Sequence, residues 1–356
     1  MKAIKIVFKF ILFLVLAVAV IAAGLFGYLT LTEYKPAEKE ALQIDRESAE
    51  KAALGESYTL VSWNIGYGAL GDNADFFMDG GKSVISSDQD RVIENLNNIS
   101  EELKKQEPDF IFLQEVDLSS RRSYKIDEVK IMKDSFPDFE SCFAYNYKVA
   151  FVPYPIPPLG KVESGLQTLS RLNISAADRL QLPCPFTWPT RLANLKRGLL
   201  VTRIPIEGSD KELILVNLHL EAYDSGEGKI EQTRILKEVI ESEMKKGNYV
   251  IAGGDFNQTF SHVDLSKYPA QEGKWASGHI DEKDFSEDWQ FLMSADTPSC
   301  RSLDQPYAGV SHEDFQYYVI DGYIVSPNVK VESFTVLDLD FVSSDHNPTL
   351  LKFTLE

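Results

Sequence analysis

Polar side chains that could do chemistry stand at the ends of several short apolar segments of the chain. Each segment has the composition of a buried strand, and strands of one sheet can bring such groups together at a common edge. The groups are carboxylates, amides and imidazoles, a combination suited to metal binding and proton transfer. In chain order they are Asn64, Glu115, His219, Asp255, Asn257, Asp321, Asp345 and His346.

This set of side chains predicts metal-assisted chemistry on phosphate. Carboxylate and amide oxygens are hard donors that suit Mg²⁺, which keeps several waters and bridges to phosphate oxygens. His219 and His346 could act as general acid or base, or contact a phosphoryl oxygen. Each fragment alone also fits a plain role: Asp255 to Asn257 fits a turn, and a histidine in an apolar strand fits a hydrogen-bonded core position. Their conjunction on successive strands favours one site over unrelated turns.

The elements that must position these groups alternate in type. Helices are predicted at 88–107, where apolar residues recur every three or four positions before Pro108, and at 229–246, where Gly247 ends the helix. Many strands at hairpin-like spacings with few helices predict the α/β class, as a mixed sandwich rather than a doubly wound parallel sheet. Strands are predicted at 58–63, 110–113, 199–204, 213–218, 249–252, 317–325, 331–337 and 349–354.

Six short motifs resemble, in order, the signature of the endonuclease/exonuclease/phosphatase superfamily of deoxyribonuclease I-like folds. The resemblance extends from Tyr58 to the C-terminus. It implies a four-layer α/β sandwich, with two mixed β-sheets face to face and helices outside, and hydrolysis of phosphate esters with Mg²⁺ or another divalent cation such as Mn²⁺ or Ca²⁺. The motifs are Ser62-Trp63-Asn64, Leu113-Gln114-Glu115, Asn217-Leu218-His219, Gly254-Asp255-Phe256-Asn257, Ile320-Asp321 and Ser344-Asp345-His346.

The resemblance also implies a division of roles among the motif residues. Glu115 would be the principal metal ligand with Asn64 beside it, and Asp345 would complete the metal shell or a second position. The attacking water and the phosphate would fall to other residues: Asp255 holds the water, Asn257 donates to a phosphoryl oxygen, His346 oriented by Asp321 acts as general base or phosphate contact, and His219 binds phosphate or protonates the leaving oxygen.

Substrate contacts outside the motifs are predicted from Arg122, Asn146 and Arg197, with solvated surface charge as the alternative for the arginines. The aromatic, proline-rich stretch 145–158 could stack bases, touch lipid or pack under a loop. The glycine-rich residues 66–81 are expected to form part of the site wall. Further basic candidates for the rim are Arg121, Lys148, Arg171, Arg191 and Lys196.

The segment around His219 resembles the branch with deoxyribonuclease I, bacterial sphingomyelinases, deadenylases and inositol polyphosphate 5-phosphatases, rather than the apurinic endonucleases. Gly322 and Asn347 stand where the 5-phosphatases usually have an arginine and a lysine, which disfavours an inositol polyphosphate as the substrate.

The N-terminus carries a long apolar run. Three lysines precede Phe10 to Thr32, which holds 23 residues without a charge and covers about 34 Å as a helix, enough for a hydrocarbon core. This favours an uncleaved anchor over residues 1–32, although Ala17-Val18-Ala19 resembles a signal cleavage site. The flanking lysines predict a single-pass cell-membrane protein with a cytoplasmic N-terminus and an extracytoplasmic domain.

Residues 33–56 are charged and alanine-rich, and we expect them to form a solvated helical stalk between the anchor and a catalytic domain at 57–356. Three cysteines are too few for a disulfide scaffold. Besides the bilayer around the N-terminal helix, the expected partner is a phosphate-ester substrate, either nucleic acid or a phospholipid headgroup. The sequence implies no protein partner.

The charge balance limits the substrate. The net charge is −18, and the chain after residue 32 carries 33 basic and 54 acidic residues, or −21. A broad basic face for nucleic acid is therefore excluded, and anionic lipid surfaces should repel the domain. The sequence also shows no hydrophobic membrane-binding hairpin of the kind expected of a sphingomyelinase. A membrane-anchored phosphodiesterase with a nuclease-like substrate is slightly favoured. A phospholipid phosphodiesterase and a non-catalytic binding module are the alternatives.

Overall fold

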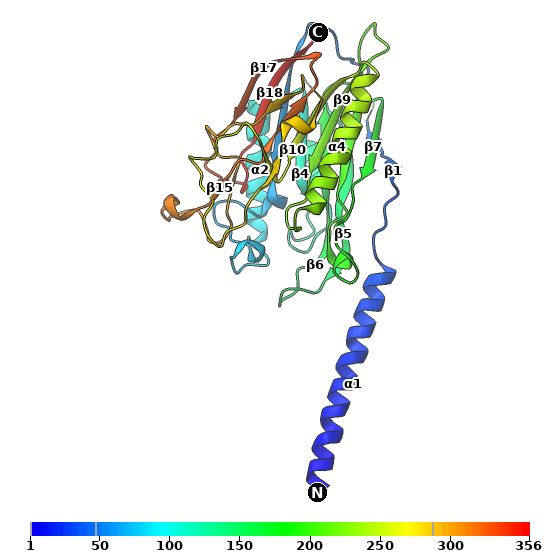
Figure 1. The fold of residues 1–356 in the computed structure, drawn as a ribbon, viewed down its shortest axis with the longest axis vertical. Helices are drawn as coiled ribbons and strands as arrows, with labels where there is room; N and C mark the ends of the chain where they lie inside the picture. The colour runs from blue at the N-terminus through cyan, green and yellow to red at the C-terminus, as the bar shows by residue number, and fades with distance from the viewer. Residues whose placement is uncertain (1, 47, 287) are drawn as a thin grey trace.

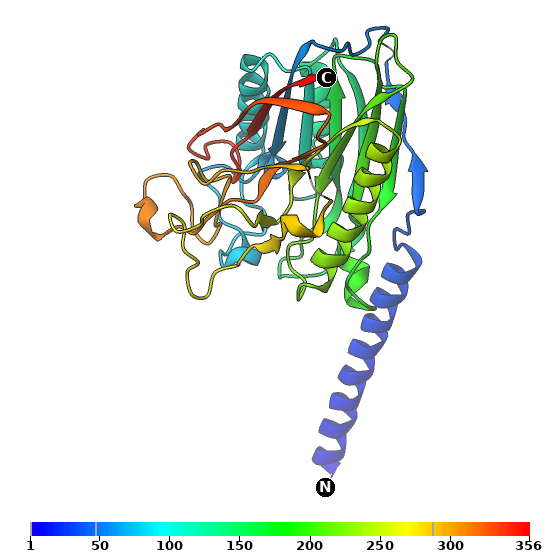
Figure 2. The same ribbon diagram turned by 45° about the horizontal axis from the view of Figure 1, so that its top comes forward.

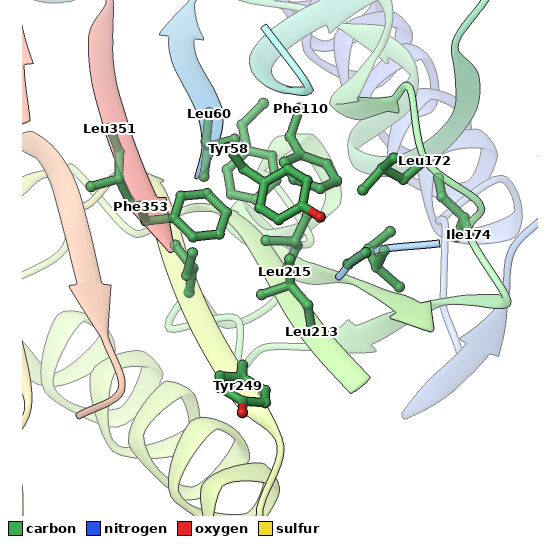
Figure 3. Close-up of a cluster of buried hydrophobic side chains, with 14 of the residues drawn as sticks. Tyr58, Leu60, Phe110, Leu172, Ile174, Leu213, Leu215, Tyr249, Leu351 and Phe353 are labelled. Atoms are coloured by element: carbon green, nitrogen blue, oxygen red, sulfur yellow. The ribbon is translucent and has the colours of Figure 1, made fainter. Parts of the chain in front are cut away.

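The computed structural model describes residues 2–46, 48–286 and 288–356. Within these residues, two seven-stranded sheets lie face to face, as Figure 1 shows. Apolar side chains from both sheets fill the space between them, among them Leu60, Phe110, Leu215 and Phe353 (Figure 3). Burial of this interface removes apolar surface from water and holds the sheets together. The predicted α/β class and the sandwich are confirmed.

The first sheet, called the β10 sheet, mixes parallel and antiparallel pairs. Its order is β1-β7-β8-β9-β10-β16-β13, with only the β9–β10 pair parallel. The strands in that order are β1 (Lys39–Ala41), β7 (Ala176–Gln181), β8 (Gly198–Pro205), β9 (Glu212–His219), β10 (Tyr249–Asp255), β16 (Asp321–Val325) and β13 (Gln290–Leu292).

The second sheet, called the β3 sheet, has the order β17-β18-β3-β4-β6-β5-β2, with only the β3–β4 pair parallel. Its strands are β17 (Val329–Val336), β18 (Thr349–Leu355), β3 (Ser57–Asn64), β4 (Phe110–Asp117), β6 (Gly160–Ser170), β5 (Glu140–Val152) and β2 (Ile44–Asp45). Two small sheets pair β11 (Gln258–Phe260) with β12 (Gly278–Ile280) and β14 (Cys300–Arg301) with β15 (Tyr317–Tyr318).

Helices cover the outer face of each sheet and complete four layers. The helices α2 (Gln89–Lys105) and α3 (Glu128–Ser135) pack on the β3 sheet, and α4 (Glu227–Lys245) packs on the β10 sheet. Helix α2 begins where the Asp88 side chain accepts a bond from the Arg91 amide, and it buries the face of Val92, Leu96 and Ile99. Short 3₁₀ helices are η1 (Gly66–Gly68), η2 (Phe77–Asp79), η3 (Thr190–Ala193), η4 (Glu282–Asp284) and η5 (His312–Asp314).

Helix α1 (Lys2–Leu31) projects away from the sandwich, at the end opposite the C-terminus (Figures 1 and 2). It is long and apolar enough to cross a membrane, and its apolar window is not buried against the sandwich. A signal sequence shares this length and composition. Its last turns contact the domain: Phe26 lies 5.9 Å from the Trp188 ring, and Leu29 is buried.

The segment after α1 corrects one expectation: residues 33–56 are not a helical stalk. Strand β1 extends the β10 sheet beside β7, and β2 extends the β3 sheet beside β5. Leu42 and Ile44 pack against the core between the sheets. Apolar side chains two residues apart, such as Leu42 and Ile44, fall on one face of an extended chain but not on one face of a helix. The charged, alanine-rich composition of the segment made this alternation hard to recognise in the sequence.

The structure differs from the sequence-based prediction in other strands as well, mainly where polar and apolar residues are mixed. The predicted strand 317–325 is two strands, β15 and β16, which belong to different sheets. The sequence reading also missed β5, β6 and β7, because charged and polar residues interrupt their apolar pattern. The predictions for helices α2 and α4 and for strands β3, β4, β8, β9, β10, β17 and β18 are confirmed within a few residues.

Candidate active site

A cavity of about 500 Å³ opens at one end of the sandwich, and both sheets contribute to it. Asn64 and Asp321 lie behind its wall, hydrogen-bonded to residues that line it. The other predicted site residues line the cavity: Glu115, Arg122, Asn146, His219, Arg197, Asp255, Asn257, Asp345 and His346.

Strand register in the β10 sheet explains how three of these groups meet. Asp255, the last residue of β10, is paired with His219 at the end of β9 and with Asp321 at the start of β16. The Asp255 Oδ2 atom lies 3.4 Å from His219 Nε2 and accepts a hydrogen bond of 3.0 Å from Asn64 Nδ2. Burial and then the Asp321 carboxylate raise the pKa of Asp255 to about 7.

His346 completes this group from the loop between β17 and β18. Its Nδ1 atom is 2.9 Å from Asp321 Oδ2, and its Nε2 atom faces Asp255 Oδ2 at 3.8 Å. Burial opposes the charged imidazolium, but the neighbouring Cys300 and the Asp321 carboxylate hold the pKa of His346 well above its usual value. Burial raises the pKa of the Cys300 thiol to about 12.

His219 has the opposite electrostatic setting. Burial first, then the Arg197 guanidinium and His346, hold the pKa of His219 well below its usual value. A neutral imidazole can donate one hydrogen bond and accept another. The neutral form therefore suits contact with a phosphoryl oxygen better than proton donation to a leaving oxygen.

The metal side of the cavity comes from the β3 sheet. Glu115 has a left-handed backbone, with φ of 54°, at an irregularity where β4 loses register with β6. Such a kink turns a side chain out of the regular alternation, and Glu115 is a half-buried carboxylate that faces the cavity. Its Oε1 atom lies 3.5 Å from Asn64 Nδ2.

The donor set fits a divalent cation. Burial raises the pKa of Asp345 to about 6, with Glu115 adding to the shift against the opposing effect of His346. Two groups of three side chains could each hold an ion as they stand: Asp255 with Asp321 and His346, and Cys300 with Asp345 and His346. Glu115 is in neither group, so a cation that it binds needs water or substrate oxygens to complete its shell, as Mg²⁺ commonly does. Such a cation would offset the buried negative charge.

Two predicted contact residues from the β3 sheet take different positions. The Arg122 guanidinium pairs with Asp117 at 3.0 Å, lies 3.9 Å from Glu115 and stacks 3.6 Å above the Tyr67 ring. The Asn146 side chain accepts a bond from the Gly198 amide. Among the described residues, the Asn146 Nδ2 group and the Tyr67 hydroxyl are buried without a hydrogen-bond partner. Both residues line the cavity and could therefore donate to a ligand.

Arg197 lies on the β10 sheet side and donates to the His219 carbonyl at 3.0 Å, with Glu221 as its ion-pair partner at 3.4 Å. Other basic candidates do not reach the reactive groups. Arg171 binds Asp109 and Glu50, away from the cavity, because its strand leads to the other end of the β3 sheet.

The sequence reading missed several cavity residues. Residues 66–81 form part of the wall as expected, but the individual roles of Tyr67 and Asp79 were not recognised. Burial and then Asp345 raise the pKa of Asp79 to about 7. Arg301 also lines the cavity, and burial lowers its pKa. It follows Cys300 in a two-residue strand, and no sequence pattern singles it out.

The fold is an α/β sandwich, and its cavity gathers carboxylate, amide and imidazole groups from both sheets. The chain belongs to the endonuclease/exonuclease/phosphatase family, whose sequence model matches residues 61–346. That range includes all six motifs from Ser62 to His346, and it leaves out residues 57–60 and 347–356 of the domain. Comparison with curated proteins gives no match.

Solved structures support the same fold at low sequence identity. An endonuclease/exonuclease/phosphatase protein from Beutenbergia cavernae is 16% identical, with a TM-score of 0.56 over 84% of this chain and 72% of that one. A family member from Bacteroides thetaiotaomicron is 16% identical, with a TM-score of 0.53 over 85% and 98%. TDP2 from C. elegans is 15% identical, with a TM-score of 0.51 over 86% and 77%.

Proposed function

We propose that this protein is a membrane-anchored enzyme that hydrolyses phosphodiester bonds with a divalent cation, Mg²⁺ in the first instance. The observation that carries the proposal is the chain of contacts from Asp321 through His346 and Asp255 to Asn64 and Glu115, along the wall of one cavity. Family membership supports hydrolysis of phosphate esters as the reaction class.

The bound cation would neutralise charge on the phosphoryl oxygens as it develops in the transition state. Glu115, Asn64 and Asp345 are the residues that we propose to hold it. The three approach the cavity from different elements, so that their oxygens can face one ion together with water and substrate.

The remaining groups act on the water and the phosphate. Asp255 accepts a hydrogen bond from the attacking water and takes its proton, a role favoured by its raised pKa. His346, held by Asp321 at Nδ1, presents Nε2 to a phosphoryl oxygen. His219 and Asn257 offer further contacts to the phosphoryl group from the β10 side. These fixed donors stabilise the developing charge without reorganisation.

Hydrolysis of bis-p-nitrophenyl phosphate tests this proposal. We expect the full-length protein in detergent to release nitrophenolate with Mg²⁺ and to stop when EDTA removes the metal. Asp255→Asn should abolish most of the activity, whereas Asp210→Asn, in an exposed turn, should leave it unchanged.

Retention of full activity by Asp255→Asn would overturn the assignment of the water-binding group. No hydrolysis by the wild-type protein, together with none of DNA, RNA or lipid, would favour the non-catalytic binding module instead.

We also propose that α1 remains uncleaved and anchors the chain with its N-terminus in the cytoplasm and residues 57–356 outside. Residues 33–56 then form the link and contribute β1 and β2 to the domain edges. The exposed apolar face of α1 and its flanking lysines support this. Release of the chain from membranes by extraction at high pH would contradict the anchor. Protease treatment of sealed vesicles would contradict the orientation if it placed the domain on the cytoplasmic side.

A further inference from the structure

The catalytic cavity has an outer wall that belongs to the membrane helix. Phe26 and Leu29 of α1 line the same cavity as Glu115, His219 and Asp255. Leu29 is buried there, although it lies in the last turn of the apolar helix. A single cavity therefore extends from the reactive carboxylates to the side of α1.

The length of α1 sets the depth of this wall in a bilayer. Lys9 is the last charge before the apolar run, and 20 residues from Phe10 to Leu29 span about 30 Å, the thickness of the hydrocarbon core. If the lysines lie at the cytoplasmic surface, Phe26 and Leu29 lie near the outer edge of the hydrocarbon. The cavity then opens at the level of the outer headgroups.

Exposed apolar side chains lie beside α1 and on a loop that borders the same cavity. The loop between β5 and β6 presents Ile156, 95% exposed, and Tyr154, 67% exposed. Tyr154 packs on Phe77 at 5.8 Å, and both line the cavity. Trp188 is half-exposed and contacts Phe26. Exposed apolar patches mark interaction sites, and aromatic rings favour the membrane interface.

Apart from Arg301, which is buried and donates to the Ser302 and Gly71 carbonyls, the basic side chains described at the cavity pair with acidic partners, which disfavours a nucleic acid. Glu33 pairs with Arg191 at 3.2 Å and with Lys196 at 3.5 Å. Arg122 and Arg197 are bound to Asp117 and Glu221, as described above. A strand of nucleic acid needs several unpaired cations along its backbone, whereas an apolar rim beside a membrane helix suits acyl chains.

Resting on the proposed phosphodiesterase function, we propose that the substrate is a phospholipid of the bilayer that α1 spans. Its acyl chains stay along Phe26, Leu29 and the exposed loop while its phosphate reaches Asp255 and the cation site. The water oxygen bonds to phosphorus, and one phosphorus–oxygen ester bond breaks. The released ester oxygen leaves as an alcohol with one water proton. The second proton stays on the product phosphate or passes to solvent.

Reconstitution of the full-length protein into vesicles of the zwitterionic lipids phosphatidylethanolamine and phosphatidylcholine tests the proposal, because repulsion of the acidic domain by anionic lipid then plays no part. Labelled phospholipid is placed either in the vesicles that hold the protein or in separate vesicles, and bis-p-nitrophenyl phosphate is measured in parallel. We expect hydrolysis of lipid in the protein's own membrane to exceed that in separate vesicles by at least about tenfold, because anchoring raises the effective concentration of substrate at the cavity.

The substitution Ile156→Asp sharpens the test. Ile156 is absent from the cavity-lining residues in the described part of the chain, so nitrophenolate release should not change. Lipid hydrolysis should fall about tenfold, because a carboxylate in the apolar membrane surface is costly. The matched control is Leu54→Asp, which adds the same charge at a 52% exposed position beside Gly55 and Leu355, at the far end of the domain. It should change neither rate.

Three results would overturn the lipid assignment while leaving phosphodiester hydrolysis in place. They are nitrophenolate release with intact phospholipid, equal lipid hydrolysis in both vesicle arrangements, and faster hydrolysis of DNA or RNA oligonucleotides than of lipid. Equal loss of lipid and soluble activity in Ile156→Asp would also remove the surface from the proposal. Loss of Mg²⁺-dependent nitrophenolate release in the wild-type protein would instead remove the proposed function itself.

Discussion

The two sheets contribute unequal halves to the cavity. The β10 sheet supplies His219, Asp255 and Asp321, which are buried and held within hydrogen-bond distance of a neighbour. The β3 sheet supplies Glu115, whose side chain is 27% exposed and has Arg122 no closer than 3.9 Å. The groups of the β10 sheet are thus fixed by strand register, while the carboxylate proposed for the metal is more exposed to the cavity.

Contacts between the sheets join these halves directly behind the cavity. Gln114 Nε2 donates to Asn217 Oδ1 at 2.8 Å, and Asn217 in turn donates to the Leu113 carbonyl. Asn64 reaches across to Asp255 in the same way. These hydrogen bonds across an apolar sandwich help to fix the relative position of the two sheets, so the site depends on the packing as well as on its own residues.

The largest expected effect belongs to His346, which joins the groups of the β10 sheet from the loop between β17 and β18. His346→Ala should lower kcat/KM by about 10²–10³-fold, the range for loss of one donor to a transition-state oxygen, and toward the upper end because Asp321 also loses the group that it orients. The measurement is turnover of bis-p-nitrophenyl phosphate with a thermal melt beside it. Loss of less than about twofold, far below that range, would remove His346 from the site.

His219→Ala should have a smaller effect, about 10²-fold, comparable with the loss of one donor to a transition-state oxygen. Since burial and Arg197 favour the neutral imidazole, the loss should be similar for substrates with good and poor leaving groups. A loss confined to poor leaving groups would assign His219 to protonation of the leaving oxygen. Combined with His346→Ala, the two losses should be less than additive.

On the β3 side, Glu115→Gln should act on metal binding. The amide keeps the shape but removes the charge, and the Mg²⁺ concentration for half-maximal activity should rise by at least about tenfold, or about 1.4 kcal/mol. The titration uses bis-p-nitrophenyl phosphate at fixed pH. An unchanged metal titration with unchanged turnover would contradict the role of Glu115.

The hydrogen bonds of Asn217 between the two sheets should contribute to the free energy of unfolding. Asn217→Ala removes the bonds that this side chain makes with Gln114 and with the Leu113 and Gln167 carbonyls, and the free energy of unfolding should fall by about 1–3 kcal/mol. Urea denaturation measures it. Asn97→Ala, on the exposed face of α2, is the matched control and should change stability by less than about 0.5 kcal/mol. Equal values for the two variants would argue against a structural role for these hydrogen bonds.

The smallest effect on soluble-substrate turnover should follow removal of residues 1–32. The reactive groups lie in the sandwich, and Phe26 and Leu29 form only the outer wall of the cavity. We expect a soluble protein that keeps most nitrophenolate release but loses the advantage toward lipid in its own membrane. An insoluble or inactive product would show that α1 supports the catalytic domain itself.

Sequence patterns predicted the site residues well where each residue stands at the end of a recognisable apolar strand. Asp255 and His219 follow uninterrupted apolar runs, so their place at strand ends could be read from composition. Tyr67 and Arg301 carry no such mark, because they enter the cavity from a 3₁₀ turn and from a two-residue strand. The prediction of a helical stalk was wrong for a related reason. Charged residues around Leu42 and Ile44 masked the two-residue apolar period that is typical of a strand.

The sequence by itself determined the strand and helix pattern of most of the core, the family and the candidate reactive residues, because these follow from local periodicity and short motifs. Only the tertiary structure decided that Asp321 and Asp255 are neighbours, that His219 and His346 have opposite pKa shifts, and that α1 forms a wall of the cavity. Such properties depend on burial and on groups distant in the chain. Local sequence does not encode which distant charges will share one low-dielectric space.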